Sequence, residues 1–176
     1  MPFLKELPPL ETERLWLRHM VPSDIEYVRQ MLADPRMTKY VIMGPMTWTA
    51  ETWLARTFER REKDGLTFLA VELKPSHTFI AQIGLLLQEV EGRKEVEVGY
   101  HLFPQYWGKG YATEAAKTCM EWAFEELNVP RVISLINPDN AASSNVAKRN
   151  GLALEREVSF RGYPANMYVL NNPNPT

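Results

Sequence analysis

The sequence predicts a single α/β (α+β) domain with one central mixed, mostly antiparallel sheet of about six to seven strands and helices on both faces. Three observations lead to this fold class. Runs of alternating or β-branched residues occur between segments of helical period. Three such runs follow one another within 67–103 with only short turns between them, as antiparallel neighbours do. The length of 176 residues suits one domain of roughly 150 residues with extended ends.

The first strand and the first helix are predicted from the residues before Pro35. Apolar and polar residues alternate over 12–19, which indicates a strand. Ser23 and Glu26 have the spacing of a capping box, in which each side chain accepts from the main-chain N–H of the other residue. We therefore expect a helix from Ser23 to about residue 33, ended by the proline.

A second helix is predicted over 49–63 from its amphipathic period. Such a helix covers one face of a sheet with its apolar stripe. The side chains expected to face inward are Trp53, Leu54 and Phe58, and those expected to face outward are Arg56, Arg60 and Arg61.

The remaining elements follow from changes of period along the chain. In order, they are strands 67–73, 79–90 and 95–103, helix 111–128, strand 131–136, helix 141–150, and strands 153–160 and 163–170. Gly151 stands where a left-handed residue ends a helix. We divide the chain into an N-terminal extension (1–9), the folded domain (10–170) and a flexible tail (171–176). The apolar face of helix 111–128 is expected to consist of Ala112, Ala116, Cys119, Ala123, Phe124 and Leu127.

Composition and charge exclude several classes of protein. The chain is 45% hydrophobic and 24% charged, an ordinary soluble mixture. Its net charge is -2, whereas a DNA-binding domain usually carries an excess of basic residues, so we expect no direct nucleic-acid partner. Cys119 is the sole cysteine, which allows no internal disulfide and no zinc cluster, and we expect no metal site. We read no signal peptide and no membrane span, and we expect a cytoplasmic monomer or homodimer with no membrane partner.

The segment that links the third consecutive strand to the next helix carries the clearest chemical signal. Gly108 and Gly110 let the main chain curl so that successive N–H groups point into one concavity. The helix start that follows adds unpaired N–H groups and partial positive charge. With the Lys109 charge and the Thr113 hydroxyl, these groups would hold a pyrophosphate. Alternatively, the glycines only permit a tight strand-to-helix turn.

The pattern of this segment resembles that of a known family. The P-loop signature is absent, and Thr113 stands where G-x-G-x-x-G needs its third glycine. What is present is Gln105-x-x-Gly108-x-Gly110-x-Ala112, followed by Thr113-Glu114-Ala115. This resembles the acetyl-CoA pyrophosphate loop of the GNAT superfamily of N-acetyltransferases. The version here resembles the RimJ/RimL-type subgroup, which modifies ribosomal-protein N-termini.

Two further segments agree with the resemblance. Asn140-Ala141-Ala142-Ser143, followed by Asn150-Gly151-Leu152, resembles the Asn-x-x-Ser helix of the subgroup with its glycine and apolar residue. The opening Glu11-Thr12-Glu13-Arg14-Leu15-Trp16-Leu17-Arg18 is similar to the first strand of the subgroup. The three motifs span about 10–170, which is nearly the whole chain.

The resemblance implies that acetyl-CoA is the cofactor and that the acetyl group passes directly to an amine, with no covalent enzyme intermediate. It also implies which residues hold acetyl-CoA. These are Tyr100, Leu102, Phe103, Gln105, Trp107, Gly108, Lys109, Gly110, Tyr111, Ala112, Thr113, Asn137, Asn140 and Ser143.

Two residues of one predicted strand are candidates for the general base that direct transfer requires. Glu97 and His101 are four residues apart, so a regular strand places both on one face. The resemblance implies that Glu97 lies near the reacting centre and acts through water. Alternatively, Glu97 continues the charged face of Glu95 and pairs with a neighbouring strand. His101 has an ordinary pKa of ~6.5, although a lone strand histidine is more often a packing residue.

The other catalytic groups are expected near the ends of two elements. Main-chain N–H groups between Tyr100 and Phe103 would polarise the acetyl carbonyl, provided that a bulge or splay frees them. The resemblance implies that Ser143 donates the proton to the departing thiolate. It further implies that Asn140, and less so Asn137, bonds the pantetheine arm. Alternatively, Asn140 or Ser143 caps the helix that follows.

Selection of the acceptor is expected in the first two helices, in the loop over 34–49 and in the last hairpin. Packing over the sheet is the alternative for most of these side chains. The residues that would wall an acceptor groove are Tyr40, Met43, Met46, Trp48 and Tyr163.

The function predicted from the sequence is an acetyl-CoA-dependent N-acetyltransferase whose acceptor is a protein N-terminal amine of the ribosomal-protein kind. One alternative is acetylation of a small-molecule amine, such as an antibiotic, a polyamine or an amino-acid derivative. Another is a non-catalytic acyl-CoA-binding domain. An open groove would favour a peptide acceptor, whereas a closed acidic pocket would favour a small cation.

Overall fold

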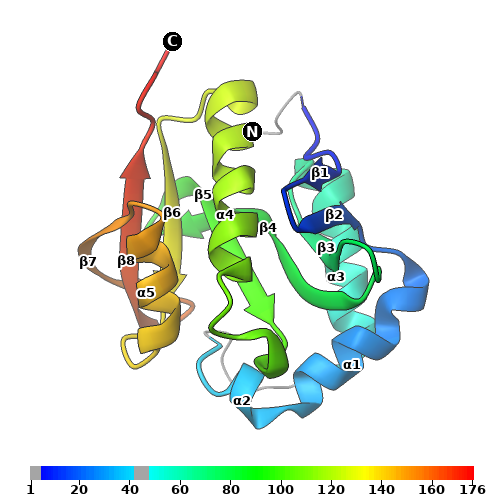
Figure 1. Cartoon of the computed structure of the whole chain (residues 1–176). Coiled ribbons are helices and arrows are strands. Elements are labelled where there is room, and N and C mark those ends of the chain that lie inside the picture. Colours follow the sequence, from blue (N-terminus) through cyan, green and yellow to red (C-terminus); the bar gives the residue numbers. More distant parts are fainter. Residues whose placement is uncertain (1–4, 42–47) are drawn as a thin grey trace.

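The computed structural model describes residues 5–41 and 48–176. Its strands form one eight-stranded mixed sheet in the order β1-β2-β3-β4-β5-β6-β8-β7, which confirms the predicted fold class (Figure 1). The strands are β1 Leu10–Glu11, β2 Leu15–His19, β3 Phe68–Leu73, β4 Phe79–Val90, β5 Arg93–Leu102, β6 Arg131–Ile136, β7 Ala153–Phe160 and β8 Tyr163–Asn171. The α-helices are α1 Ile25–Ala33, α2 Pro35–Thr38, α3 Ala50–Asp64, α4 Tyr111–Trp122 and α5 Ala141–Arg149. Short turns of other helix types are η1 Pro22–Asp24, η2 Pro104–Tyr106 and η3 Ala123–Leu127.

The elements agree closely with those expected from the sequence, with three local differences. The short strand β1 adds an eighth strand, and the helix α2 is new. The Asp34 side chain starts α2, because its Oδ1 accepts from the Arg36 N–H at 2.9 Å. The predicted helix over 111–128 ends as an α-helix at Trp122 and continues as one π turn.

The predicted capping box of Ser23 and Glu26 is wrong. The chain instead makes one 3-10 turn before α1, and the Val21 N–H donates to Asp24 Oδ2 at 2.8 Å. Asp24 is 2% exposed and is held by Arg18, so its carboxylate is already oriented toward this N–H. The helix therefore begins at a turn held by Asp24 and its ion pair with Arg18, and not at a capping box of Ser23 and Glu26.

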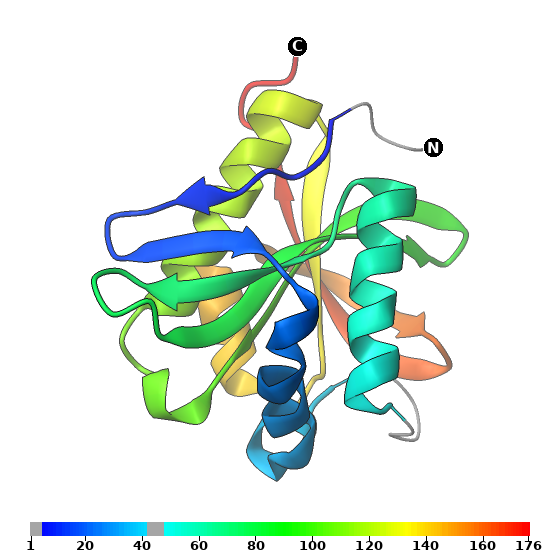
Figure 2. The same cartoon turned by 90° about the vertical axis from the view of Figure 1, so that its right-hand side faces the viewer.

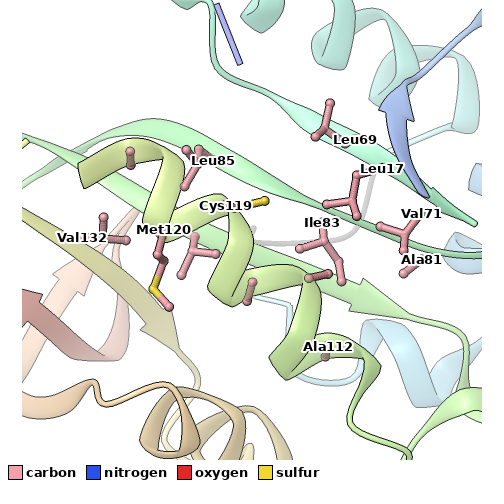
Figure 3. Close-up of a cluster of buried hydrophobic side chains, with 14 of the residues drawn as sticks. Leu17, Leu69, Val71, Ala81, Ile83, Leu85, Ala112, Cys119, Met120 and Val132 are labelled. Carbon is pink, nitrogen blue, oxygen red and sulfur yellow. The ribbon is translucent and has the colours of Figure 1, made fainter. Parts of the chain in front are cut away.

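The helices cover the two faces of the sheet. Figure 2 shows α1 and α3 in front of the sheet, with α4 and α5 behind it. The side of α4 that meets the sheet is made mostly of small residues, among them Ala112, Ala116 and Cys119, which belong to the apolar face that the sequence predicted; Met120 is also buried there. These residues pack with Ile83 and Leu85 of β4 (Figure 3). Because the side chains are small, α4 can lie close to the sheet.

The sheet divides between β5 and β6, and this division positions the site. β5 pairs with β4 along its whole length, but it pairs with the parallel strand β6 only at Glu97 and Ile133. Beyond that point the two strands separate (Figure 1). Two side-chain bonds span the start of the gap: Glu97 Oε2 accepts from the Leu135 N–H at 2.8 Å, and Ser134 Oγ donates to the Val98 carbonyl at 3.2 Å. Side chains thus replace the main-chain ladder where the strands part.

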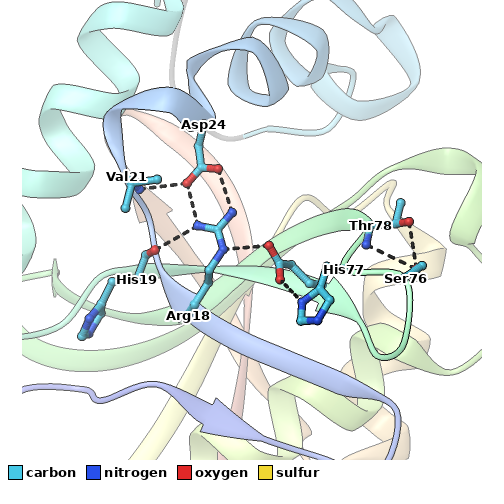
Figure 4. Close-up of polar contacts among 8 residues, drawn as sticks. Arg18, His19, Val21, Asp24, Ser76, His77 and Thr78 are labelled. Atoms are coloured by element: carbon cyan, nitrogen blue, oxygen red, sulfur yellow. Dashed lines mark hydrogen bonds and ion pairs between the residues drawn. The ribbon is translucent and has the colours of Figure 1, made fainter.

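The start of α1 is attached to the sheet by an ion-pair network (Figure 4). Arg18 Nη1 and Nη2 each donate to an Asp24 carboxylate oxygen at 2.9 Å, and Arg18 Nε donates to Glu72 Oε2 at 2.8 Å. His77 Nδ1 lies 3.2 Å from the other Glu72 oxygen. The two carboxylates raise the pKa of Arg18 against the lowering effect of burial.

In the parts of the chain that the structure describes, no helix is long and apolar enough to cross a membrane.

The C-terminal tail after β8 is hydrogen-bonded to the segment before β6. In the C-terminal tail, Asn172 is 8% exposed and its Nδ2 donates to the Val129 carbonyl at 3.0 Å. The Asn128 side chain bonds both the N–H and the carbonyl of Thr176, at 3.1 and 3.0 Å.

Replacement of Asp24 by alanine is expected to destabilise the fold strongly. The change leaves the Arg18 guanidinium without its bidentate partner and the Val21 N–H without an acceptor. We expect the free energy of unfolding, measured by urea denaturation, to fall by about 3 kcal/mol. Lys117→Ala is the matched control, because it removes an exposed pair at 3.9 Å and should cost no more than about 0.5 kcal/mol. Equal losses in the two variants would contradict this assignment.

Candidate active site

A cavity of about 510 Å³ occupies the gap between β5 and β6 and opens toward both faces of the sheet. On the α4 face it is lined by the predicted pyrophosphate loop and by the first turns of α4 and α5. On the α3 face it is lined by aromatic and arginine side chains, including Trp53, Phe68 and Arg60. The cavity therefore joins two chemically different surfaces through the parted strands.

The loop before α4 presents a run of free main-chain donors. Gly108 and Gly110 have φ of +76° and +82°, a conformation that glycine adopts without strain. The Trp107 N–H donates to the Pro104 carbonyl at 3.1 Å, so the run of free donors begins at Gly108. From Gly108 to Thr113, no N–H donates a hydrogen bond to any part of the chain that the structure describes.

The Thr113 hydroxyl is the second sign of a ligand on the α4 face. Thr113 lines the cavity, and its Oγ1 is buried with no hydrogen-bond partner among the described residues. A buried hydroxyl without a partner costs free energy that a bound ligand would recover. Six consecutive free N–H groups, a helix N-terminus and this hydroxyl have the chemistry that a diphosphate requires.

Arg14 supports the loop from behind, a role that the sequence analysis missed. Its Nη1 donates to the Lys109 carbonyl at 3.0 Å, and its Nε donates to Glu114 Oε1 at 2.8 Å. Its guanidinium lies 4.3 Å from the centre of the Tyr111 ring. Arg14 belongs to the opening motif that resembles the first strand of the family. The sequence therefore singled out this residue but did not indicate that it contacts Lys109 and Glu114.

The edge of β5 provides donors inside the gap. The Phe103 N–H bonds the Ile80 carbonyl on β4 at 2.9 Å. Because N–H groups alternate in direction along a strand, those of Tyr100 and Leu102 face the gap instead. The Leu102 carbonyl likewise faces outward and accepts from Trp107 Nε1 at 2.8 Å. The expected splay that frees these donors is thus present in the structure.

Glu97 lies at the point where the strands part, and it is 8% exposed. Its Oε1 accepts from Gln88 Nε2 at 3.0 Å and its Oε2 accepts from the Leu135 N–H. Burial raises the pKa of Glu97, although these two hydrogen bonds and two arginines lower it in part. Glu97 bonds neighbouring strands, as one alternative from the sequence expected, and it also lines the cavity; its role as a base stays a prediction.

His101 lies on the α3 face, where aromatic rings surround it. Its ring meets Trp53 and Phe68 edge to face, with centres 5.8 and 5.3 Å apart. Burial lowers the pKa of His101 to about 4. The imidazole is therefore neutral at physiological pH and is a weak base, which agrees with the packing role considered from the sequence.

The start of α5 places three polar residues on the cavity wall. Asn140 caps the helix, because its Oδ1 accepts from the Ser143 N–H at 3.1 Å, and Asn137 Oδ1 accepts from the Asp139 N–H at 3.0 Å. The amide Nδ2 groups of these two asparagines remain as donors. The Tyr100 hydroxyl donates to the Ser143 carbonyl at 2.7 Å, and burial raises the pKa of this hydroxyl, so it keeps its proton. The sequence analysis considered only the main chain of Tyr100.

The predicted site residues are brought together unequally. Phe103 is buried against Phe79 and does not line the cavity, and the exposed side chains of Gln105 and Lys109 do not line it either. Tyr163 is 42% exposed and stands apart. Met43 and Met46 lie outside the described residues. The predicted residues that do line the cavity are Tyr40, Trp48, Glu97, Tyr100, Leu102, Trp107, Gly108, Gly110, Tyr111, Ala112, Thr113, Asn137, Asn140 and Ser143.

Arg60 was expected to face outward, and this expectation is wrong. The side chain is 8% exposed, and its Nη1 donates to the Leu87 carbonyl at 3.2 Å. Arg161, in the turn between β7 and β8, also lines the cavity and was not singled out from the sequence. Arg60 lies three residues after the buried Thr57 and therefore on the same face of the helix. This spacing indicated an inward position, but the charge of Arg60 led us to expect an outward one.

Cys119 takes no part in the site. It is buried on α4 with the core residues, and burial raises the pKa of its thiol to about 12. The thiol is therefore protonated and shielded, which agrees with a reaction that has no cysteine nucleophile. Among the described residues, no group of histidine, cysteine, aspartate or glutamate is arranged to hold a metal ion.

Comparison with known proteins gives concordant matches. The model of the acetyltransferase (GNAT) domain matches residues 14–153. YkkB of Bacillus subtilis (strain 168) is 30% identical, over 94% of this chain and 96% of YkkB. Spermidine N(1)-acetyltransferase of Escherichia coli (strain K12) is 26% identical, over 93% of this chain and 80% of the relative. The crystal structure of an acetyltransferase from Agrobacterium tumefaciens superposes with a TM-score of 0.80 at 30% identity, covering 97% of this chain and 98% of the other.

The low pKa of His101 predicts a pH-dependent stability. Between pH 7 and 5 the unfolded chain protonates this imidazole near its ordinary pKa of ~6.5, while the native protein does not, so unfolding becomes easier as the pH falls. In urea denaturation, His101→Phe should therefore lose less unfolding free energy over this range than the wild type, by at most about 1.4 kcal/mol per pH unit. Above pH 7.5 the imidazole is neutral in both the native and the unfolded state, so the unfolding free energies of the two proteins should change with pH in parallel. Parallel curves over the whole range would refute the burial of a neutral His101.

Proposed function

We propose that this chain, which belongs to the acetyltransferase (GNAT) domain family, acetylates the N-terminal amine of a protein, as the RimJ/RimL-type motifs suggest. Acetyl-CoA is the acetyl donor of this family. One observation carries the proposal. The cavity between β5 and β6 joins the donor-rich loop on one face to an aromatic-lined mouth on the other. A thioester held on the α4 face would meet an amine that enters from the α3 face.

The residues on the α4 face fit acetyl-CoA. The free N–H groups from Gly108 to Thr113 and the unpartnered Thr113 hydroxyl would hold its diphosphate. The Nδ2 groups of Asn137 and Asn140 would bond the amides of the pantetheine arm. Bound there, acetyl-CoA supplies a thioester whose carbonyl carbon forms the new amide bond while its bond to sulfur breaks.

The chain supplies the proton transfers and the electrostatic stabilisation. Glu97, whose pKa burial raises, would take the proton that the acceptor amine loses, directly or through water. The N–H groups of Tyr100 and Leu102 would stabilise negative charge that develops on the carbonyl oxygen. The Ser143 hydroxyl would donate the proton that the departing sulfur takes up, and Tyr100 would position Ser143 through its carbonyl.

Replacement of Gly108 by tryptophan tests the loop. An indole at this position would fill the concavity that the N–H groups face, so we expect the affinity for acetyl-CoA, measured by calorimetry, to fall about tenfold or more.

The matched control for this variant is Gly92→Trp in the turn between β4 and β5. Gly92 also has a positive φ, +83°, and a Cβ at either glycine would meet nothing within 4 Å. Both variants therefore carry a similar backbone strain of about 1–2 kcal/mol. Full acetyl-CoA affinity in Gly108→Trp would remove the loop from the binding site.

Replacement of Glu97 by glutamine tests the base. We expect kcat to fall about 10²-fold, with acetyl-CoA affinity retained, because Gln88 can rotate its amide to keep a hydrogen bond. In the wild type, kcat/KM should fall as the pH drops through the raised pKa of Glu97, because only the carboxylate accepts a proton. The part of this acid limb that Glu97 causes should vanish in the variant, whereas the part caused by protonation of the acceptor amine should remain.

The control is Glu95→Gln, which loses the buried pair with Arg131 but lies outside the cavity. It should lower stability and leave the pH profile unchanged. An acid limb in Glu97→Gln that is identical to that of the wild type would show that another group is the base.

A further inference from the structure

Two guanidinium groups line the α3 side of the cavity without a carboxylate partner. Neither Arg60 nor Arg161 forms an ion pair with any residue that the structure describes. The remaining residues, 1–4 and 42–47, include no acidic residue in the sequence. Arg60 is 8% exposed and Arg161 is exposed, and desolvation lowers the pKa of both arginines. Such a pair of cations is expected to attract an anion.

Both side chains are held in place by other contacts. Arg60 donates one hydrogen bond to the Leu87 carbonyl and keeps its remaining N–H groups free for a ligand. The Arg161 guanidinium lies 4.9 Å from the centre of the Phe160 ring. Arg161 and Gly162 have φ of +53° and +81°, so a tight turn fixes where Arg161 leaves the main chain. Arg60 is thus presented by a helix, and Arg161 by a tight turn between two paired strands.

The charge balance on this side of the cavity is positive. Glu97 is the one acidic residue that lines the cavity in the described part of the chain, and its oxygens accept from Gln88 and Leu135 instead of from an arginine. Three further arginines line the cavity: Arg56 pairs with Glu59 at 3.0 Å, Arg36 pairs with Asp34 at 2.8 Å, and Arg149 belongs to α5 on the opposite face of the sheet. On the α3 side, Arg60 and Arg161 are therefore the cations left for a ligand.

This anion site is separate from the diphosphate site. Arg60 belongs to α3, and the free N–H groups precede α4 on the opposite face of the sheet (Figure 2). Arg161 lies near enough to Arg60 and Glu97 that their charges influence one another. The cations consequently belong to the acceptor side, close to the proposed base.

We infer that the acceptor is a primary amine that also carries a carboxylate near the amine, bound by Arg60 and Arg161 while the amine faces Glu97. This inference rests on the proposed function. Guanidinium groups match the planar geometry of a carboxylate. Their positive field also favours the neutral form of the nearby amine, which is the form that reacts. A free amino acid and the N-terminus of a peptide with an acidic residue both have this chemistry.

The same charges oppose a polycation. A spermidine-like acceptor would bring several ammonium groups beside two unpaired arginines, with Glu97 alone to offset them. The sequence analysis linked a small cationic acceptor to an acidic pocket, and the lining seen in the structure has the opposite charge. The acceptor class thus differs from that named for the 26% identical spermidine relative.

The inference is tested with pairs of acceptors that differ only in the carboxylate. The full-length protein is given saturating acetyl-CoA, and release of coenzyme A thiol is measured. The panel holds free amino acids and their C-terminal amides, amidated peptides with Glu or Gln at position two, and spermidine. We expect kcat/KM to be about tenfold or more higher for the carboxylate member of each effective pair. The amino-acid and peptide arms identify the source of the carboxylate.

Variants then assign the effect to the arginines. Arg161→Gln should raise KM for the carboxylate acceptor about tenfold or more and leave kcat almost unchanged. The KM for the matched amide acceptor should also stay almost unchanged. Arg161→Glu should shift the preference toward spermidine. The control is Arg93→Gln, an equal charge change at an exposed residue outside the cavity, which should leave all ratios unchanged.

The possible outcomes separate the inference from the proposed function. Turnover of amides or spermidine equal to that of the carboxylates would refute the inference and leave the acetyltransferase assignment standing. A carboxylate preference that survives in Arg161→Gln and in Arg60→Gln would refute the role of the arginines. Loss of thiol release with every acceptor would overturn the proposed function, and the inference with it.

Discussion

The parting of β5 from β6 is the constraint on which the rest of the molecule depends. Adjacent parallel strands normally hydrogen-bond to one another's N–H and carbonyl groups along their length. Here the ladder is reduced to one pair, and the Glu97 carboxylate and the Ser134 hydroxyl satisfy the first groups beyond it. The strands can therefore separate without leaving buried polar groups unpaired at the fork. The same separation turns the outer edge of β5 into a wall of the cavity.

Elements from opposite ends of the sequence hold the two walls of this gap. The turn between β1 and β2 supplies Arg14, which bonds the Lys109 carbonyl and Glu114 and so anchors the loop and the first turn of α4. The small face of α4 brings that helix start close to the sheet. On the other wall, Tyr100 bonds the Ser143 carbonyl and ties α5 to β5. Neither wall is built from neighbours in the sequence, which explains why the opening motif matters to a distant loop.

The two faces of the cavity differ in the groups that could attract a charged ligand. The α4 face offers main-chain N–H groups, whose partial charges bind phosphate oxygens without a fixed net charge. The α3 face offers two complete charges on Arg60 and Arg161, beside a buried carboxylate and a neutral His101. The phosphate-bearing donor and the carboxylate-bearing acceptor that we propose would thus be distinguished by face. Glu97 lies at the boundary, where it both stabilises the fork and faces the acceptor side.

The sequence by itself determined the order of elements, the apolar face of α4 and the glycine turn before that helix, because each depends on neighbours along the chain. Only the tertiary structure decided which charged residues line the cavity. Helical period placed Arg60 with Arg56 and Arg61 on a polar face, yet the Leu87 carbonyl of β4 gives the Arg60 side chain a hydrogen-bond partner. Arg60 and Arg161 are 101 residues apart, and Arg14 bonds the carbonyl of Lys109, 95 residues away. Local periodicity contains no information on such pairs, since their energy arises from contacts that form when distant segments pack.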